Sequence, residues 1–141
     1  MPYQALRQDY YTYHDYYTWP EGERWELIDS KAYNMSPELM RRHQQVVVEL
    51  RRQIANFLQN HRCQVYTAPF DARLPRSGEA NDLVATLVQT DLLVICDPEK
   101  LNNADCCGAP DWIIEVLLPA TTVKDQIEKR KLYQRHGVKE Y

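Results

Sequence analysis

The segment APDWIIEVLLP, residues 109–119, is the most informative part of the sequence for the fold. Apolar residues occupy both odd and even positions from Trp112 to Leu118, which is typical of a strand covered on both faces. A carboxylate, Glu115, nevertheless stands at the centre of this run. Because the burial of an unpaired carboxylate is costly, Glu115 is a candidate functional residue.

The apolar segment LVQTDLLVICD, residues 87–97, supplies a partner for this strand, and a turn-rich loop joins the two. We expect an antiparallel pair with Leu93 opposite Ile113. This register places Asp91 opposite Glu115 on the same side of the sheet, with β-carbons about 5 Å apart, where two carboxylates repel each other. Two arrangements relieve the repulsion: one carboxyl keeps its proton with a raised pKa, or a cation such as Mg²⁺ binds between them.

Other interpretations of these two acids stay open at this point. A register shift of one residue would place Asp91 and Glu115 on opposite faces of the sheet. Glu115 would also be satisfied at a sheet edge that faces solvent, or by a bond from an arginine such as Arg73. Spacing alone therefore does not choose between a metal site and a structural role.

The remaining segments carry helix and strand patterns. We expect a short helix capped by Thr12 and Asp15, a hairpin turning at Asp29–Ser30, an amphipathic helix over 38–60, strands over 63–68 and 70–74, and a helix from Thr122 to about His136, before Gly137. This order predicts a single mixed α/β domain over residues 1–141, with a central mixed β-sheet flanked by helices on both faces.

The net charge of -3 is unevenly distributed along the 141 residues. It is +3 over 38–62, -6 over 63–120 and +3 over 121–141. An acidic centre flanked by basic segments suits a metal site beside a phosphate backbone, although chance clustering produces the same pattern.

Apolar length and cysteine spacing indicate the compartment. No segment is apolar over the length needed to cross a bilayer, and the N-terminal sequence has neither the basic start nor the apolar block of a secretory signal. We therefore expect a soluble cytoplasmic protein without a membrane partner. The four cysteines include the adjacent pair Cys106 and Cys107 but no Cys-x-x-Cys spacing, which favours reduced, partly buried thiols over a zinc site.

Further candidate residues lie in the other predicted elements. Glu26, inside the strand-like segment RWELID, is a candidate third ligand or base, or alternatively a sheet-edge residue. His43 lies on the apolar side of the long helix, where a core histidine bonded to a backbone carbonyl is favoured over a functional one. On the last helix, Asp125, Lys129 and Tyr133 share one face at steps of four. Lys129 is a candidate cation for phosphodiester hydrolysis, and the alternative is an exposed ion pair with Asp125.

Basic residues of the two helices are candidate phosphate contacts, or parts of a solvated face. They are Arg41, Arg42, Arg51 and Arg52 on the first long helix, and Lys124 and Lys131 on the last.

The order of the segments RWELID, RRHQQVVVEL, TDLLVICDPEK, PDWIIEVLLPAT and KDQIEKRKLYQRHGVKEY resembles the Uma-type restriction endonuclease family, a former domain of unknown function in the PD-(D/E)XK nuclease superfamily. The resemblance extends from about Thr12 to Tyr141. It implies a restriction-endonuclease-like fold and metal-dependent hydrolysis of DNA phosphodiester bonds. Because the family normally continues with further strand beyond the position of Tyr141, the resemblance also implies that at least one C-terminal strand is absent.

The resemblance also implies residue roles. Asp91 and Glu115 match the strand acids that bind Mg²⁺, with Mn²⁺ as an alternative, and Glu26 matches the acid of an early strand. Lys129 matches a helical lysine that replaces the superfamily's strand lysine, since Leu117 stands at the strand position. The same helical motif includes Asp125 and Tyr133. Apart from the resemblance, His43 is a further candidate for orienting the substrate or the ligands.

Two rival functions belong to other classes. The first is a catalytically inactive nucleic-acid-binding or assembly module derived from such a nuclease, which the residue at Leu117 and the missing strand favour. The second is a structural subunit of a homodimer that forms at an exposed sheet edge.

Overall fold

The structure, a computed structural model, describes residues 10–20, 23–35, 41–117 and 123–141, without the side chains of residues 124 and 125. Its helices are α1 (Tyr13–Tyr17), α2 (Arg41–Phe57) and α3 (Val123–Arg135), with the short 3₁₀ helices η1 (Asn81–Leu83) and η2 (Pro98–Lys100). Its strands are β1 (Trp25–Ile28), β2 (Lys31–Asn34), β3 (Gln64–Thr67), β4 (Asp71–Arg73), β5 (Leu87–Gln89), β6 (Leu92–Ile95), β7 (Asp105–Cys107) and β8 (Trp112–Ile114).

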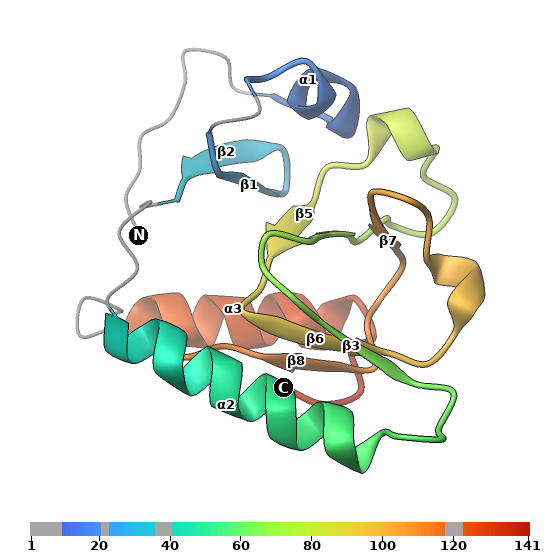
Figure 1. The fold of residues 1–141 in the computed structure, drawn as a ribbon. Helices are drawn as coiled ribbons and strands as arrows, with labels where there is room; N and C mark the ends of the chain where they lie inside the picture. Colours follow the sequence, from blue (N-terminus) through green and yellow to red (C-terminus); the bar gives the residue numbers. More distant parts are fainter. Residues whose placement is uncertain (1–9, 21–22, 36–40, 118–122) are drawn as a thin grey trace.

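The described strands form two sheets (Figure 1). The first has the order β2-β1-β5-β4-β7, in which β4 and β7 are parallel and the other neighbours are antiparallel. The second has the order β3-β6-β8 and is antiparallel. The predicted mixed α/β class is confirmed, but the strands are divided between two sheets, where the sequence predicts one.

The division falls inside the segment 87–97, which the sequence predicts as one strand. β5 ends at Gln89 in the five-stranded sheet, whereas β6 begins at Leu92 in the three-stranded sheet. Both strands are buried throughout, so the apolar pattern continues across the break and does not reveal it. Asp91 therefore lies where the chain passes from one sheet to the other.

Helices α2 and α3 cover opposite faces of the three-stranded sheet, as predicted (Figure 1). Ile54 of α2 packs with Leu92 and Val94, whereas Tyr133 of α3 packs in the core that contains Leu93. Because side chains alternate along a strand, this arrangement explains why the segment is apolar at odd and even positions. The core around Tyr133 also includes residues of β4 and β5, so α3 packs against both sheets. None of the described helices combines the length and apolar character needed to cross a membrane.

The predicted register between the two apolar strands is confirmed. Leu93 of β6 pairs with Ile113 of β8 in an antiparallel ladder. β8 ends at Ile114, so Asp91 and Glu115 lie one residue beyond the last pair of the ladder. Both acids therefore stand at the same end of the two strands.

Local signals at the first helix and the hairpin are also confirmed. The backbone N–H of Thr12 donates to the Asp15 carboxylate at 2.9 Å. Asp29 and Ser30 have φ angles of 49° and 71°, the positive values that a two-residue hairpin turn requires. Gly137, with φ of 85°, follows the end of α3.

The cysteines differ from the prediction of reduced thiols. Cys63 and Cys96 form a disulfide. The register of β3 against β6 places Gln64 opposite Ile95, so the two cysteines stand opposite each other one step further along. The sequence does not reveal this pair because it does not show that β3 and β6 are neighbours. Cys106 and Cys107 are free, as predicted.

Candidate functional site

The buried Glu26 of β1 and the partly buried Lys129 of α3 form an ion pair. Nζ of Lys129 lies 2.9 Å from both carboxylate oxygens of Glu26, and the Gln89 backbone N–H donates to Oε2 at 3.0 Å. The interpretation of Glu26 as a sheet-edge residue is wrong, because β1 is paired with strands on both sides. The ion pair joins the five-stranded sheet to α3.

The buried Tyr133 links this ion pair to Glu115. Its hydroxyl donates to Oε1 of Glu115 at 3.3 Å and lies 3.4 Å from Nζ of Lys129. Lys129 and Tyr133 are one helical turn apart, so α3 presents both side chains to the ends of the strands. The alternative in which Arg73 satisfies Glu115 is wrong, because Arg73 binds the buried Asp105 at 2.8 Å.

The electrostatics of the cluster show an excess of negative charge. Burial is the largest cause that raises the pKa of Glu115 to about 7, and the charges of Glu26 and Asp91 raise it further against the opposing charge of Lys129. Burial lowers the pKa of Lys129, but the charge of Glu26 and the neighbouring acidic groups raise it well above its ordinary value. Lys129 is therefore a permanent cation near neutral pH.

Asp91 is held from two sides at the junction of the sheets. Its Oδ2 accepts the backbone N–H of Val116 at 2.8 Å and lies 3.3 Å from Nε2 of the buried His43. The favoured interpretation of His43 as a core histidine bonded to a backbone carbonyl is wrong, because its partner is this carboxylate. The bond to Val116, the residue that follows Glu115, ties Asp91 to the segment that carries Glu115, so the two acids lie next to each other at the end of β6 and β8.

These contacts bring together four of the predicted residues, Glu26, Asp91, Glu115 and Lys129, with Tyr133 and His43 as supports. Carboxylate oxygens are the ligands that Mg²⁺ prefers in proteins, and a cation would offset the repulsion that raises the pKa of Glu115. Among the described residues there is no group of three or more His, Cys, Asp or Glu side chains arranged for a metal ion. The adjacent carboxylates of Asp91 and Glu115 have the chemistry of a Mg²⁺ site in which one or two carboxylates bind the ion and water or phosphate oxygens complete its shell.

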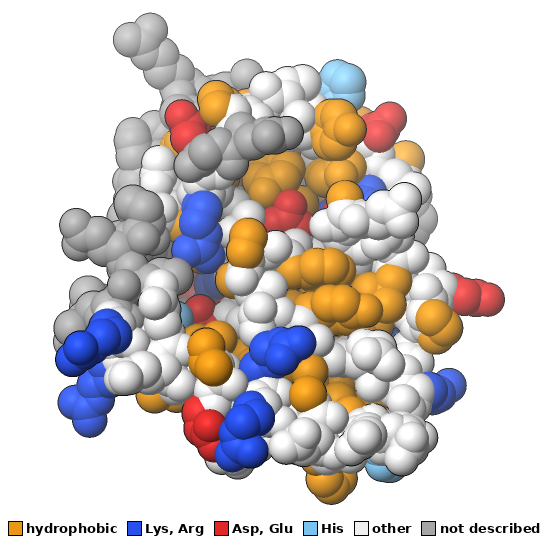
Figure 2. Space-filling view, in the orientation of Figure 1, with side chains coloured by type: hydrophobic (Ala, Val, Ile, Leu, Met, Phe, Trp, Pro, Cys, Tyr) orange, Lys and Arg blue, Asp and Glu red, His pale blue; other side chains and the backbone are white. Residues whose placement is uncertain are grey.

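The predicted basic contacts lie at the surface. Arg41 and Arg42 are exposed at the start of α2, and Lys131 is exposed on α3. Lys and Arg side chains gather on the molecular face that carries α2 (Figure 2). The side chains of Lys124 and Asp125, and the predicted cap Thr122, lie outside the described part of the chain, so the expected ion pair between Asp125 and Lys129 is not tested.

Gln89 is a residue of the site that sequence reasoning missed. Besides its backbone bond to Glu26, its side-chain amide donates to Asp71 at 2.8 Å and accepts from Arg24 at 3.0 Å. A polar residue inside an apolar strand, two positions before Asp91, was the available signal. It connects the acids of the site to a second polar network in the five-stranded sheet.

Comparison with known proteins identifies a similar fold and the family of the chain. A solved structure described as "a putative nuclease belonging to DUF820 from Anabaena variabilis" is similar, with a TM-score of 0.69 and 18% sequence identity. The match covers 91% of this chain and 70% of that chain, and at this identity it shows the fold. No curated protein matches the sequence. A family model described as "Putative restriction endonuclease" matches residues 12–141. The chain therefore belongs to the Uma2 family.

Proposed function

We propose that the chain is a divalent-metal-dependent endonuclease that hydrolyses DNA phosphodiester bonds. The observation that carries the proposal is that Asp91 and Glu115 lie at the same end of β6 and β8, with the ion pair of Glu26 and Lys129 beside Glu115. Membership of a family described as restriction endonucleases supports the same reaction class.

Asp91 and Glu115 are the proposed ligands of Mg²⁺, with Mn²⁺ as an alternative. When bound, the ion would activate a water molecule and neutralise charge on the phosphate. His43 and the Val116 N–H hold Asp91, and the Tyr133 hydroxyl holds Glu115. Such supports fix the orientation of ligating carboxylates, and their loss typically weakens metal binding about 10–100-fold.

Lys129 is the proposed cation that orients the attacking water or the scissile phosphate. Glu26 fixes the position of its ammonium group through two contacts of 2.9 Å. Because its pKa is raised well above the ordinary value, Lys129 keeps its proton and does not act as a general base. Its role is electrostatic, in the manner of other fixed cations at reacting phosphates.

The exposed Arg41 and Arg42 are proposed contacts for the DNA backbone beside the acids, with Lys124 and Lys131 on α3 as further candidates. Basic side chains position a nucleic acid through its phosphates and carry no sequence information by themselves. We therefore expect weak sequence preference from these contacts.

Cleavage of supercoiled plasmid in Mg²⁺ tests the proposal. We expect cleavage by the wild-type chain that is abolished by chelator and lost in Asp91→Asn and Glu115→Gln. The matched control Glu49→Gln changes an exposed glutamate of α2 and should retain full activity. Cleavage that persists in both Asp91→Asn and Glu115→Gln would refute the assignment.

A catalytically inactive nucleic-acid-binding module is the second candidate. The observation that favours it is that Lys129 is already paired with Glu26, while the strand position at Leu117 carries an exposed apolar residue. DNA binding that weakens with salt, ignores Mg²⁺ and is accompanied by no turnover would support this candidate.

A further inference from the structure

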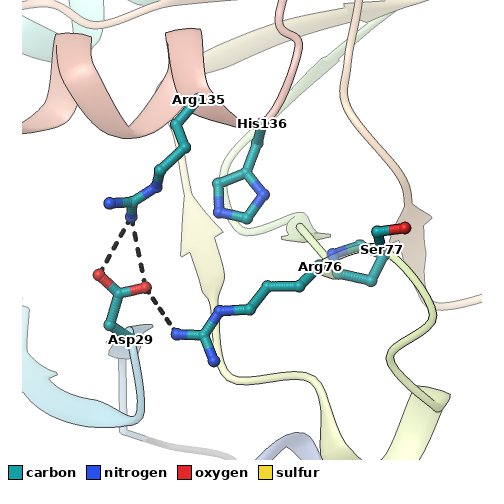
Figure 3. A pocket seen from close by; sticks show the side chains of 6 residues that line it. Asp29, Arg76, Ser77, Arg135 and His136 are labelled. Atoms are coloured by element: carbon teal, nitrogen blue, oxygen red, sulfur yellow. Dashed lines mark hydrogen bonds and ion pairs between the residues drawn. The ribbon is translucent and has the colours of Figure 1, made fainter.

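A cavity of about 460 Å³ lies away from the acids, at the C-terminal end of α3 (Figure 3). It is formed by the hairpin turn after β1, the loop after β4 and the last residues of α3. Its lining residues are Asp29, Pro75, Arg76, Ser77, Arg135 and His136. This volume is within the range of about 300–1,000 Å³ that is common for small-ligand sites.

Two guanidinium groups converge on one carboxylate in this cavity (Figure 3). Arg76 donates to Asp29 at 3.0 Å, and Arg135 donates to both oxygens of Asp29 at 3.0 and 3.3 Å. Each guanidinium has five N–H donors, so these bonds use a minority of the donors that the pair offers. Asp29 therefore fixes the two cations beside the cavity without saturating them.

The other groups around the cavity are a hydroxyl, a neutral imidazole whose free nitrogen is an acceptor, and one further acid. Ser77 contributes a hydroxyl to the lining. His136 bonds to the Pro75 backbone carbonyl, and its Nε2 is buried without a partner among the described residues. Glu79 is a further acid close by: its Oε1 accepts the backbone N–H of Arg76 at 3.1 Å, and its Oε2 lies 3.9 Å from the Arg76 guanidinium. The donors offered to a ligand are thus the remaining N–H groups of Arg76 and Arg135 and the Ser77 hydroxyl.

We propose that this cavity binds a phosphate group, either free or carried as a monoester at the end of a nucleic acid. Paired arginines suit this ligand because their planar guanidinium groups bind phosphate oxygens through parallel hydrogen bonds. Asp29 holds the arginines in place in the absence of the ligand and competes with it for the same donors. The site is separate from the proposed catalytic acids, and it does not depend on hydrolysis.

Because Asp29 and phosphate compete for the same arginine donors, removing the charge of Asp29 is the most specific test. Asp29→Asn removes the competing charge while the turn is kept, since asparagine is well suited to the positive φ of 49° at this position. We expect this variant to bind phosphate more tightly than the wild type. Arg76→Gln and Arg135→Gln should each weaken binding about tenfold, the effect of losing one hydrogen bond to a charged group.

The measurement is a calorimetric titration of the folded protein with inorganic phosphate at low ionic strength. Arg62→Gln, which changes an exposed arginine after α2, is the matched control and should bind like the wild type. Absence of phosphate binding in the wild type would overturn the proposal. An equal loss in Arg62→Gln and Arg135→Gln, or weaker binding in Asp29→Asn, would overturn it as well.

A second pair of titrations identifies the source of the phosphate. A dinucleotide with a 5′-phosphate that binds more tightly than inorganic phosphate would assign the cavity to a nucleic-acid end. Equal affinity for the two would assign it to free phosphate. If a dinucleotide with a 5′-hydroxyl binds as well as the phosphorylated one, recognition of phosphate at this cavity is refuted.

Discussion

At the residue scale, the carboxylates of the candidate site outnumber its lysine, so the site carries an excess of negative charge. Glu26 is paired with Lys129, but Asp91 and Glu115 meet beyond the ladder of β6 and β8 with hydrogen-bond donors as their partners. The pKa of Glu115 records this excess, since it is raised by burial and by both neighbouring acids. A site of this kind gains stability from a proton or from a bound cation.

The first prediction concerns pH. The pKa of Glu115 is about 7 in the folded protein, against an ordinary value of 4.5. Between these values the folded protein binds more protons than the unfolded chain, so the free energy of unfolding falls as pH rises through this window. The contribution is on the order of 3 kcal/mol. Urea denaturation at pH 4.5 and 7.5 should show that Glu115→Gln removes this part of the pH dependence. An identical pH dependence in the variant would contradict the shift.

The second prediction concerns the ion pair. Lys129→Met keeps most of the apolar side chain but leaves the carboxylate of Glu26 buried and unpaired, which should lower the free energy of unfolding by about 3–5 kcal/mol. Adding Glu26→Gln should restore part of this loss. Arg52→Met, which removes one half of an exposed pair, is the control and should have little effect in urea denaturation. Equal effects of Lys129→Met and Arg52→Met would show that the Glu26–Lys129 pair contributes no more to the free energy of unfolding than an exposed surface pair.

At the element scale, the position of the site follows from a break between two strands. The sequence predicts the pairing of β6 with β8 correctly, because two apolar runs joined by a loop have few possible registers, and the one with Leu93 opposite Ile113 is observed. It does not predict that Gln89 and Leu92 belong to different sheets, because both neighbouring segments are buried and apolar. Because of this break, Asp91 lies at the junction of the two sheets, and α3 packs against both of them.

The third prediction concerns the disulfide between β3 and β6. Cys63 and Cys96 are 33 residues apart, and closing a loop of this length typically contributes about 2–4 kcal/mol. The double variant Cys63→Ala/Cys96→Ala should lose this amount in urea denaturation. The wild-type protein under reducing conditions should match the variant. A variant as stable as the oxidised wild type would show that the crosslink does not constrain the unfolded chain.

At the scale of the whole molecule, the fold brings together residues that no local pattern connects. Glu26 and Lys129 are 103 positions apart, and their contact depends on how β1, β5 and α3 pack. The sequence therefore predicts the candidate residues one by one, from carboxylates in apolar segments, but not which of them are partners. The phosphate cavity at Arg76 and Arg135 was not predicted for the same reason, since exposed arginines are common on any surface.

The fourth prediction concerns the basic surface that faces solvent beside α2. If Arg41 and Arg42 contact phosphates, replacing both with glutamine should lower the slope of log K against log salt for duplex DNA by about 2, since each phosphate contact contributes about 0.9. Fluorescence anisotropy at several salt concentrations measures this slope. Arg62→Gln, which changes an exposed arginine outside the candidate set, should leave the slope unchanged. An unchanged slope in the double variant would show that Arg41 and Arg42 do not contact DNA phosphates.

The most direct test of the account is a calorimetric titration with Mg²⁺, repeated with Mn²⁺. The account predicts that the wild-type chain binds the cation and that Asp91→Asn and Glu115→Gln bind it at least about tenfold more weakly, because each variant removes one ligating charge. Glu49→Gln should bind like the wild type. Equal heats and affinities for the wild type and Glu115→Gln would contradict a cation shared by Asp91 and Glu115.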